Sequence, residues 1–371
     1  MDETLTCVCC GAEVHRDEVC FVGDQPLCRD CADEETFVCD NCGFRHWDSD
    51  NQGDDRYDLC PSCREEYFVA CSECGRLIPN SEAWYDGDDD ETPPYCESCY
   101  REKVGDALHP YSYKPSPVFY GGGPLYLGVE LEVDGAGQSA SHARTVLNVI
   151  NRQKEYAYMK TDGSLDDGLE LVTHPCTLEE HRTKVPWAET VAAFREMHYN
   201  SHNAGTCGLH VHVNRDALGE HSAAQDETIS KILYLFERFW QEILRFSRRT
   251  ESQMNHWAAR YGYKNSAKEI LEHAKYDSGN GRYACVNLTN HDTIEFRAFR
   301  GTLKLNTLIA TLQFVDHICR VALALSESEI KDLSWPEFVL RLTDESTPEL
   351  IQYLKERRLY INEPVTAEWE G

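Results

Sequence analysis

The chain has 371 residues, 18 cysteines and a formal net charge of −28. Its length leaves room for more than one domain, and its charge argues against nucleic acid as a partner, because an acidic surface repels phosphate backbones. The start, MDETLTCVCC, lacks the basic and apolar regions of a signal peptide, and charged residues interrupt the most apolar stretch, 307–325. We therefore expect a cytoplasmic protein that has no membrane partner.

Cysteine content and charge both change near residue 105. Fourteen of the 18 cysteines lie at or before Cys99, and residues 1–109 hold 28 acidic and 8 basic side chains, a net charge of about −20 (28 − 8). The segment 109–124, HPYSYKPSPVFYGGGP, is rich in proline and glycine, which resist regular structure. We predict that it is a linker between a cysteine-rich front part and a globular domain.

Pairs of the form C-x-x-C recur through the front part, two to a repeat. The first pair of each repeat begins at residue 7, 39 or 71, a step of 32. In a reducing compartment such cysteines are metal ligands rather than disulfides, and four thiolates in two pairs fit a tetrahedral zinc site. The predicted zinc ligands are Cys7, Cys10, Cys28 and Cys31, then Cys39, Cys42, Cys60 and Cys63, then Cys71, Cys74, Cys96 and Cys99.

The repeats predict three zinc modules, at 1–35, 36–68 and 69–108. A glycine follows each first pair, where a tight turn needs its backbone freedom, and each second pair opens a helix. The modules resemble treble-clef zinc fingers of the LIM and related types, and their small size implies that metal supplies folding energy. A structural role and the docking of a protein partner both stay open, as do the roles of Cys9 and Cys20, which do not fit the repeat.

The back part opens with an alternating strand, YLGVELEVDG, at 126–135. Successive strand residues point to opposite faces, so its leucines and valines share one face, while Glu130 and Glu132 share the other. A helix is predicted at 140–156. The next short strand carries Glu170, which points away from its apolar neighbours.

A helical stretch at 178–203 leads to a second alternating strand, GLHVHVN, at 208–214. His210 and His212 lie on one face of this strand, opposite to its leucine and valines. An amphipathic helix is predicted at 226–250, because apolar residues recur there at helical spacing.

Two further strands are predicted, RYACVNL at 282–288 and TIEFRAFRG at 293–301. In the second of these, Glu295 and Arg297 share a face. The residues 327–371 form a C-terminal extension with helical starts, which we assign to packing.

Polar residues on several strands thus gather on one face of the predicted sheet, although a single alternating strand usually marks only a solvated face. Carboxylates at this density need cations, and an oxygen-rich set suits Mg²⁺ or Mn²⁺ better than zinc. Hard metals beside arginines indicate phosphate chemistry. The candidate site residues are Glu130, Glu132, Glu170, His210, His212, Arg282, Glu295, Arg297 and Arg300.

The motifs GVELEV, DGSL with GLELVTHP, GLHVHV, and RYACVNL with TIEFRAFRGTL occur in this order over about 125–325. In this order and spacing they resemble the amidoligase family, which is similar to glutamine synthetase and glutamate–cysteine ligase and has many phage members. The resemblance implies an α+β fold, with a curved antiparallel sheet, helices behind it and a funnel-shaped site on the concave face. It also implies a reaction: ATP phosphorylates a carboxylate, and an amine displaces the phosphate to form an amide.

The resemblance to glutamine synthetase implies two metal sites. Glu132 and Glu170 would hold one metal ion. Glu130, His210 and Glu295 would hold a second one, nearer to the ATP phosphates.

It also implies roles for the remaining candidates. Arg297 would contact the transferring phosphoryl group, and Arg282 would lie beside it or beside the substrate carboxylate. His212 would face the substrate, and Arg300 is a candidate of the same kind. Asp162 is a candidate partner of Glu170 in the first metal site.

Two other functions must be weighed. The chain could be a zinc-dependent adaptor whose back domain, 125–326, binds a ligand without turning it over, but a binding module has no need to keep the carboxylates and arginines together. A zinc hydrolase using His210 and His212 lacks the H-E-x-x-H signature. The substrate pair stays open among amino acids, cell-wall peptides and protein tails, and a bacterial or phage-infected host cytoplasm is the expected location.

Overall fold

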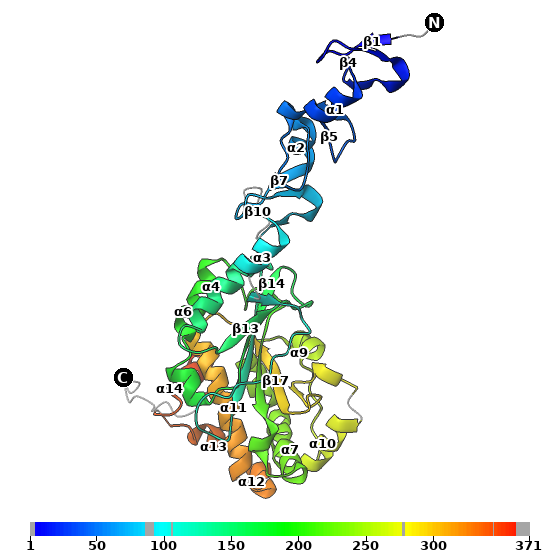
Figure 1. The fold of residues 1–371 in the computed structure, drawn as a ribbon. Coiled ribbons are helices and arrows are strands. Elements are labelled where there is room, and N and C mark those ends of the chain that lie inside the picture. The colour runs from blue at the N-terminus through cyan, green and yellow to red at the C-terminus, as the bar shows by residue number, and fades with distance from the viewer. Residues whose placement is uncertain (1–3, 86–92, 105–106, 277–278, 344, 361–371) are drawn as a thin grey trace, which may run out of the picture. The chain divides into compact units, whose positions relative to one another are not determined.

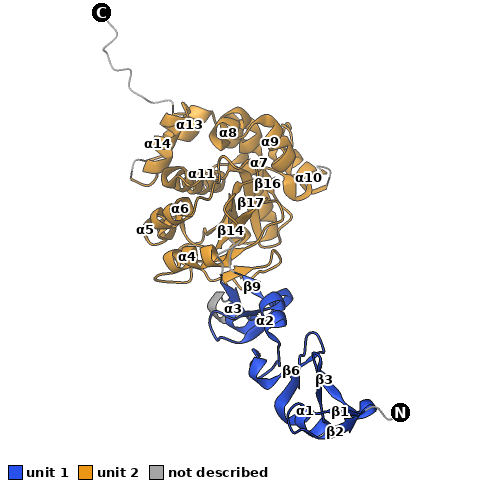
Figure 2. Ribbon diagram, turned by 90° about the horizontal axis from the view of Figure 1, so that it is seen from above, with its two compact units in different colours: residues 1–106 blue, residues 107–371 orange. Residues whose placement is uncertain are grey.

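The computed structural model describes residues 4–85, 93–104, 107–276, 279–343 and 345–360. The chain divides into two compact units, residues 1–106 and residues 107–371, which Figure 2 shows in blue and orange. The acidic run DGDDDE at 86–91, which the sequence indicates as an insertion between the two cysteine pairs of the third module, lies outside the described residues.

The first unit repeats a pattern of short hairpins followed by a helix. A glycine with positive φ follows the first cysteine pair of each repeat, as the sequence predicts: Gly11 at 75°, Gly43 at 74° and Gly75 at 73°. Its elements are β1 (Thr4–Thr6), β2 (Glu13–His15), η1 (Arg16–Glu18), β3 (Cys20–Val22), β4 (Gln25–Leu27), α1 (Arg29–Glu35), β5 (Thr36–Val38), β6 (Arg45–Trp47), η2 (Asp48–Asp50), α2 (Pro61–Tyr67), β7 (Phe68–Ala70), β8 (Leu77–Pro79), η3 (Asn80–Glu82), β9 (Trp84–Tyr85), β10 (Pro94–Tyr95) and α3 (Glu97–Val104).

A seven-stranded sheet organises the second unit, in the order β11–β13–β14–β12–β15–β17–β16. This confirms the predicted α+β class. The prediction of an antiparallel sheet is wrong at one edge, because β11 runs parallel to β13, with Leu108 opposite Met159. The strands are β11 (Leu108–His109), β12 (Leu127–Asp134), β13 (Ala157–Lys160), β14 (Gly168–Thr173), β15 (Gly208–Asn214), β16 (Val286–Asn287) and β17 (Thr293–Arg300).

The segment 109–124, predicted as a linker, lies within the second unit. His109 pairs with Lys160 at the edge of the sheet, and Tyr120 forms a bridge with Cys176. The backbone N–H of Val118 donates to His174. These contacts order the segment although its prolines and glycines exclude a long helix or strand.

Helices cover the apolar face of the sheet (Figure 1). Leu127, Val129, Leu131 and Val133 of β12 are fully buried there, and they belong to one continuous core that the helices share. The helices are α4 (Ala140–Ile150), α5 (Leu178–Thr183), α6 (Trp187–Glu196), η5 (Arg215–Leu218), α7 (Ser222–Arg238), α8 (Trp240–Ser247), α9 (Glu251–Trp257), α10 (Ala267–Tyr276), η6 (Gly281–Tyr283), α11 (Leu305–Ala324), α12 (Glu327–Asp332), α13 (Trp335–Leu340) and α14 (Pro348–Glu356).

Several predicted helices are shorter than expected or divided. The helix predicted at 140–156 ends at Ile150, because the side chain of Asn151 binds both the N–H and the C=O of Ala157. The stretch 178–203 contains α5 and α6, separated before Pro186, which cannot continue a helix. The helix predicted at 226–250 is divided into α7 and α8.

The helix α11 forms the centre of the helical layer and lies against α7 and α14. Among the described residues, it is the one helix that is long and apolar enough to cross a membrane, and 83% of its most apolar window is buried inside the structure. Such burial is typical of a core helix.

Candidate active site and zinc clusters

The polar residues of the sheet lie in rows that run across neighbouring strands, because residues opposite each other in an antiparallel pair point to the same face. One row joins Lys160, Glu170 and Glu132, from β13 through β14 to β12. A second row pairs Glu130 with His210. The register therefore brings together Glu130 and His210, which are 80 residues apart in the chain.

A third row contains His212, Glu295 and Asn287, from β15 through β17 to β16. Between the second and third rows the register of β15 and β17 shifts, since Leu209 lies opposite Phe299 and Val211 lies opposite Phe296. This irregularity is typical of a β-bulge, which re-aims side chains near functional sites.

Residues of these rows belong to two groups, and within each group the possible ligand atoms all lie within 4.8 Å of one another. The Glu132 cluster contains Glu132, Asp162 and Glu170. The Glu130 cluster contains Glu130, His212 and Glu295. The Glu132 cluster includes Asp162, which the sequence offered as a partner of Glu170. The Glu130 cluster contains His212, whereas the resemblance to glutamine synthetase implies His210 as the ligand there.

His210 lies between the two clusters rather than inside one of them. Its Nδ1 is 3.2 Å from Glu130 Oε2, 3.7 Å from Glu295 Oε1 and 3.8 Å from Glu132 Oε1. His212 instead places Nε2 at 3.1 Å from Glu130 Oε1, while its Nδ1 is 3.2 Å from the hydroxyl of Thr293. The geometry thus places His212 in the Glu130 cluster, with His210 beside it.

The carboxylates of the two clusters differ in their electrostatic environment. Burial, together with the charges of Glu130 and Glu132, raises the pKa of Glu170 well above its ordinary value. Burial also acts on Glu130, but the neighbouring imidazoles of His212 and His210 outweigh it and hold the pKa of Glu130 well below its ordinary value. The Glu132 cluster therefore lacks part of the positive charge that its carboxylates require.

Buried ligand atoms in both clusters make ion-pair contacts: Lys160 Nζ lies 3.0 Å from Glu170 Oε2, and Glu130 Oε1 lies 3.1 Å from His212 Nε2. Glu170 Oε2 and His212 Nε2 are buried, and neither makes a directed hydrogen bond within the described part of the chain. Buried polar groups are normally hydrogen-bonded, so these atoms keep the capacity to ligate a cation. With their mainly oxygen donors, the residues present fit Mg²⁺ or Mn²⁺.

The predicted arginines lie at different places around the clusters. Arg297 forms an ion pair with Glu295 through Nη1, and its Nε is buried with no hydrogen bond to a described residue. Arg282 lies on η6 rather than on the predicted strand, and donates to the hydroxyl of Tyr111 at 2.6 Å. Arg300 lies opposite Gly208 on β15 and donates to the backbone C=O of Arg248 at 3.4 Å.

Sequence reasoning missed several residues that contact the site. Asn287 is buried and donates from Nδ2 to Glu295 Oε2 at 2.7 Å, and Asn290 donates to the same oxygen at 3.3 Å. Lys160 forms an ion pair with Glu170. Burial, opposed in part by Glu132, lowers the pKa of Arg249 to about 10. An alternating pattern in AYMK, residues 157–160, could have indicated Lys160; no comparable pattern marks the asparagines or Arg249.

Asp134 anchors the loop that carries Asp162. Its carboxylate accepts hydrogen bonds from the backbone N–H groups of Asp166 at 3.1 Å, Asp167 at 2.7 Å and Gly135 at 2.9 Å, and from the hydroxyl of Thr206 at 2.7 Å. Although burial opposes them, these donors lower the pKa of Asp134. The end of β12 thus positions a ligand of the Glu132 cluster.

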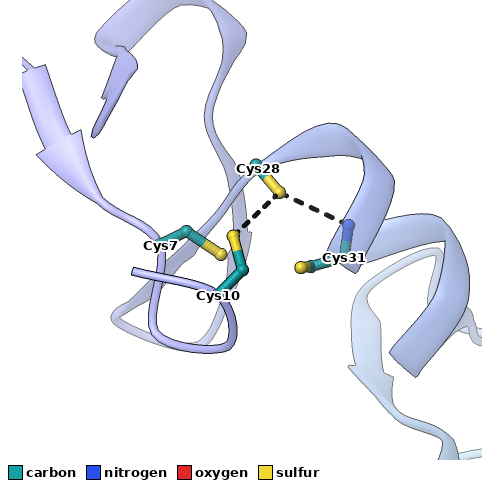
Figure 3. A group of neighbouring side chains, drawn as sticks. All are labelled: Cys7, Cys10, Cys28 and Cys31. Carbon is teal, nitrogen blue, oxygen red and sulfur yellow. Dashed lines mark hydrogen bonds between the residues drawn. The ribbon is translucent and has the colours of Figure 1, made fainter. Parts of the chain in front are cut away.

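The first unit contains the three predicted cysteine groups, each of four thiols whose sulfur atoms lie within 4.8 Å of one another. In Figure 3 the first group converges from a turn and from the start of α1, and Cys10 Sγ lies 3.7 Å from Cys28 Sγ. Sulfurs bound to one tetrahedral zinc ion at about 2.3 Å lie about 3.8 Å apart. The clusters therefore fit zinc.

Their electrostatics support the same reading. Backbone N–H groups of Cys10 and Cys28 lower the pKa of Cys7 to about 6. In the third group, the neighbouring thiols of Cys96 and Cys74 raise the pKa of Cys99 to about 12. Four such thiols cannot all ionise unless a cation neutralises them.

A separate cavity of about 470 Å³ lies among α5, α6 and the start of α11, and Arg182, Trp187 and Ile309 are among its lining residues. None of the candidate site residues lines it. It lies apart from the two carboxylate clusters, so we assign the chemistry to the clusters, whose side chains converge from four strands and the loop after β13.

One comparison with known proteins, a family model, matches the region that carries most of the motifs. Residues 148–319 match the model of a family described as "Putative amidoligase enzyme". No curated protein matches the chain. Among solved structures, a bifunctional glutathione synthetase from Pasteurella multocida matches with 17% identity and a TM-score of 0.34, over 63% of this chain and 46% of that chain, so the match spans less than half of that enzyme. The resemblance to the amidoligase family that the sequence motifs indicate is therefore confirmed for residues 148–319.

Proposed function

We propose that the second unit is an ATP-dependent carboxylate–amine ligase that forms an amide through an acyl phosphate. One observation carries the proposal: two carboxylate clusters and the guanidinium of Arg297 converge on one face of a rigid sheet. The family match over 148–319 supports ligase chemistry in general. On this proposal the sheet corresponds to the active-site sheet of glutamine synthetase, with magnesium or manganese at the clusters.

The clusters and Arg297 would serve phosphoryl transfer. Divalent cations bound there would neutralise the negative charge on phosphate oxygens. Arg297, two positions from Glu295 on β17, would stabilise the charge that develops on the transferring phosphoryl group. Since Glu295 is held by Arg297, Asn287 and Asn290, these contacts fix its position before substrates bind.

The reaction balances without a nucleophilic side chain. A carboxylate oxygen of the substrate forms a bond to the γ-phosphorus of ATP as the bond to ADP breaks. The amine then forms a bond to the acyl carbon, the carbon–oxygen bond breaks with release of phosphate, and the amine loses a proton to water. The protein contributes orientation and electrostatic stabilisation.

Arg282 and Arg300 are proposed contacts for the substrate carboxylate, and His212 a ligand of the Glu130 cluster. The first unit, on this proposal, holds three structural zinc ions. Its partner, if it docks one, is a protein, and the substrates of the second unit are a small molecule or a peptide.

The test is ATP turnover by the full-length protein with Mg²⁺ and pooled amino acids and peptides. We expect ADP and a product whose mass equals the two substrates less one water, and loss of both in Glu295→Gln. A protein that binds ATP and pool members by calorimetry but forms no ADP would favour a binding module. Absence of ATP binding in wild-type protein would contradict the proposal.

A further inference from the structure

The carboxylates of both clusters are largely covered in this structure. The side chain of Glu170 is 2% exposed, that of Glu132 is 7% exposed and that of Glu295 is 5% exposed. Glu130 keeps 20% of its side chain exposed. A nucleotide needs wider access to these side chains than such exposure gives, so the element that lies over them controls how substrates reach the site.

A turn at 110–113 lies over the polar face of β13. Tyr158 and Lys160 are two positions apart on that strand and point to the face that carries the carboxylate clusters. The ring of Tyr113 packs edge-on against that of Tyr158, with centroids 5.4 Å apart. The centre of the Tyr111 ring lies 5.3 Å from Lys160 Nζ. Both tyrosines of the turn therefore rest on the polar face.

The same turn reaches the opposite edge of the sheet through one hydrogen bond. Arg282, on η6 just before β16, donates from Nη1 to the Tyr111 hydroxyl at 2.6 Å. Five strand-to-strand steps separate β13 from β16, which is about 24 Å at the usual spacing of strands. A contact between side chains so placed requires the turn and η6 to approach each other above the polar face. The Tyr111–Arg282 bridge therefore crosses that face.

The bridge is held firmly on the side of η6 and weakly on the side of the turn. Arg282 donates from Nη2 to the Tyr283 hydroxyl at 3.0 Å, and its guanidinium lies 5.0 Å from the centre of the Tyr283 ring. Tyr111, in contrast, is 49% exposed. A hydrogen bond between exposed groups competes with water and breaks at low cost, so the turn can be released while Arg282 stays in place.

We propose that the Tyr111–Arg282 bridge is a gate, closed in this structure, that must open to admit metal-bound ATP to the carboxylate clusters. The inference rests on the proposed function, which brings anionic substrates to this face. An anionic oxygen of a substrate is a stronger acceptor for the guanidinium than a tyrosine hydroxyl, because its hydrogen bond is charge-assisted. Substrate therefore replaces Tyr111 on Arg282 and keeps the gate open. Tyr111 acts through Arg282 and is a positioning residue.

The experiment follows binding of a fluorescent ATP analogue, with Mg²⁺, to the full-length, zinc-containing protein by stopped flow. Because opening precedes binding, the observed rate of the wild type should reach a plateau as the nucleotide concentration rises, and the plateau is the opening rate. Tyr111→Phe keeps the ring on Lys160 but removes the bridge. We expect it to raise the plateau about three- to tenfold, the factor that corresponds to one exposed hydrogen bond.

Tyr283→Phe is the matched control. It removes a second hydroxyl that accepts a hydrogen bond from Arg282, but both residues belong to η6, so the bridge stays and the plateau should equal that of wild type. Peptide-resolved hydrogen exchange gives a readout that needs no nucleotide. The N–H of Tyr113, which donates to the C=O of Pro110 at 2.9 Å within the turn, should exchange faster in Tyr111→Phe than in Tyr283→Phe. Circular dichroism checks that each variant folds.

Two outcomes overturn the gate alone: a wild-type rate that rises linearly with nucleotide concentration, or equal plateaus in wild type and Tyr111→Phe. The wild-type measurement decides even if a variant does not fold. Absence of nucleotide binding to wild-type protein would instead contradict the proposed function.

Discussion

Glu295 and Arg297 illustrate how neighbouring residues on one strand take different parts in the proposed site. Glu295 is buried, and it receives hydrogen bonds from Asn287 and Asn290 in addition to its ion pair with Arg297. The nearby imidazoles lower its pKa against the effect of burial. The lowered pKa favours an ionised Glu295, the form that the proposed metal site requires, while Arg297 keeps a buried N–H with no hydrogen-bond partner among the described residues.

Replacing Arg297 should affect turnover more than binding. Arg297→Ala removes a charge that would act in the transition state, so we expect kcat to fall by roughly 10²–10³-fold with little change in the KM for ATP. The measurement is steady-state ADP formation with an active substrate pair. Arg320→Ala, which removes an arginine that pairs with Asp316 at 2.6 Å outside the site, serves as the control and should keep full activity. Equal kcat values for wild type and Arg297→Ala would place the site elsewhere.

At the scale of elements, Gly208 at the start of β15 lies close to side chains of the site on both β12 and β15. Its N–H donates to Glu132 Oε2, and a Cβ placed on it would lie 2.4 Å from His210 Nε2 and 3.0 Å from Arg249 Nη2. A side chain at this position would displace both groups. The absence of a side chain at Gly208 therefore allows His210 and Arg249 to pack against the backbone at the start of β15.

Gly208→Ala should weaken Mn²⁺ binding and lower stability by about 1–3 kcal/mol, because overpacking a buried site forces neighbouring side chains to move. Gly128→Ala is the matched control: it lies on the same face of the neighbouring strand, and its Cβ would meet the Cβ of His212 at 3.5 Å and the C=O oxygen of Thr173 at 3.9 Å, both ordinary contacts. Thermal melting and Mn²⁺ calorimetry distinguish the two. If both alanines behave alike, the close approach at Gly208 has no functional importance.

The loop anchored by Asp134 predicts a pH dependence. Asp134→Asn should cost about 1–3 kcal/mol at pH 7, because the amide cannot satisfy the donors that the carboxylate accepts. The pKa of Asp134 is lowered in the folded protein, so its contribution is present above the unfolded value of about 3.9 and is lost as the pH falls through the folded value.

The difference in denaturant stability between wild type and Asp134→Asn should therefore be constant from about pH 5 to 7 and shrink toward pH 3. The measurement is a set of urea unfolding curves at several pH values. Asp167→Asn is the comparison, because Asp167 contacts Asp134 through its backbone N–H, which the substitution keeps. A difference that grows on acidification would refute the assigned role.

The elements also show which parts of the site the sequence can predict. Strict alternation of apolar and polar residues predicted β12 and β15, and it also predicted that their glutamates and histidines share the polar face of the sheet, because such alternation is typical of a β-strand. Which histidine joins the Glu130 cluster is set by pairing between strands, and the pairing of β15 with β17 includes a register shift that alternation within a single strand does not reveal. Lys160 and Asn287 reach the site only through cross-strand register, a long-range property that local patterns do not contain.

At the scale of the whole molecule, the two units derive their stability from different sources. The second unit has one continuous apolar core, whereas the apolar clusters of the first unit are small and consist partly of cysteines of the three four-cysteine groups. Small modules of this kind need metal to fold. Metal removal should therefore affect the two units differently.

Full-length protein prepared without chelators should contain three zinc ions, one for each group of four cysteines. Chelation with 1,10-phenanthroline should abolish hydrogen-exchange protection in the hairpins of residues 4–85 and leave β12 and β15 protected, because their core contains no metal ligand of the first unit. Peptide-resolved exchange reads each unit within the intact chain.

Cys39→Ser removes a buried ligand and should lower the zinc content to two. Cys9→Ser removes an exposed thiol outside the three groups and should keep three zinc ions. Three zinc ions in Cys39→Ser would contradict the assignment of Cys39 as a ligand. Loss of hydrogen-exchange protection in β12 after chelation would contradict the prediction that the second unit folds without zinc.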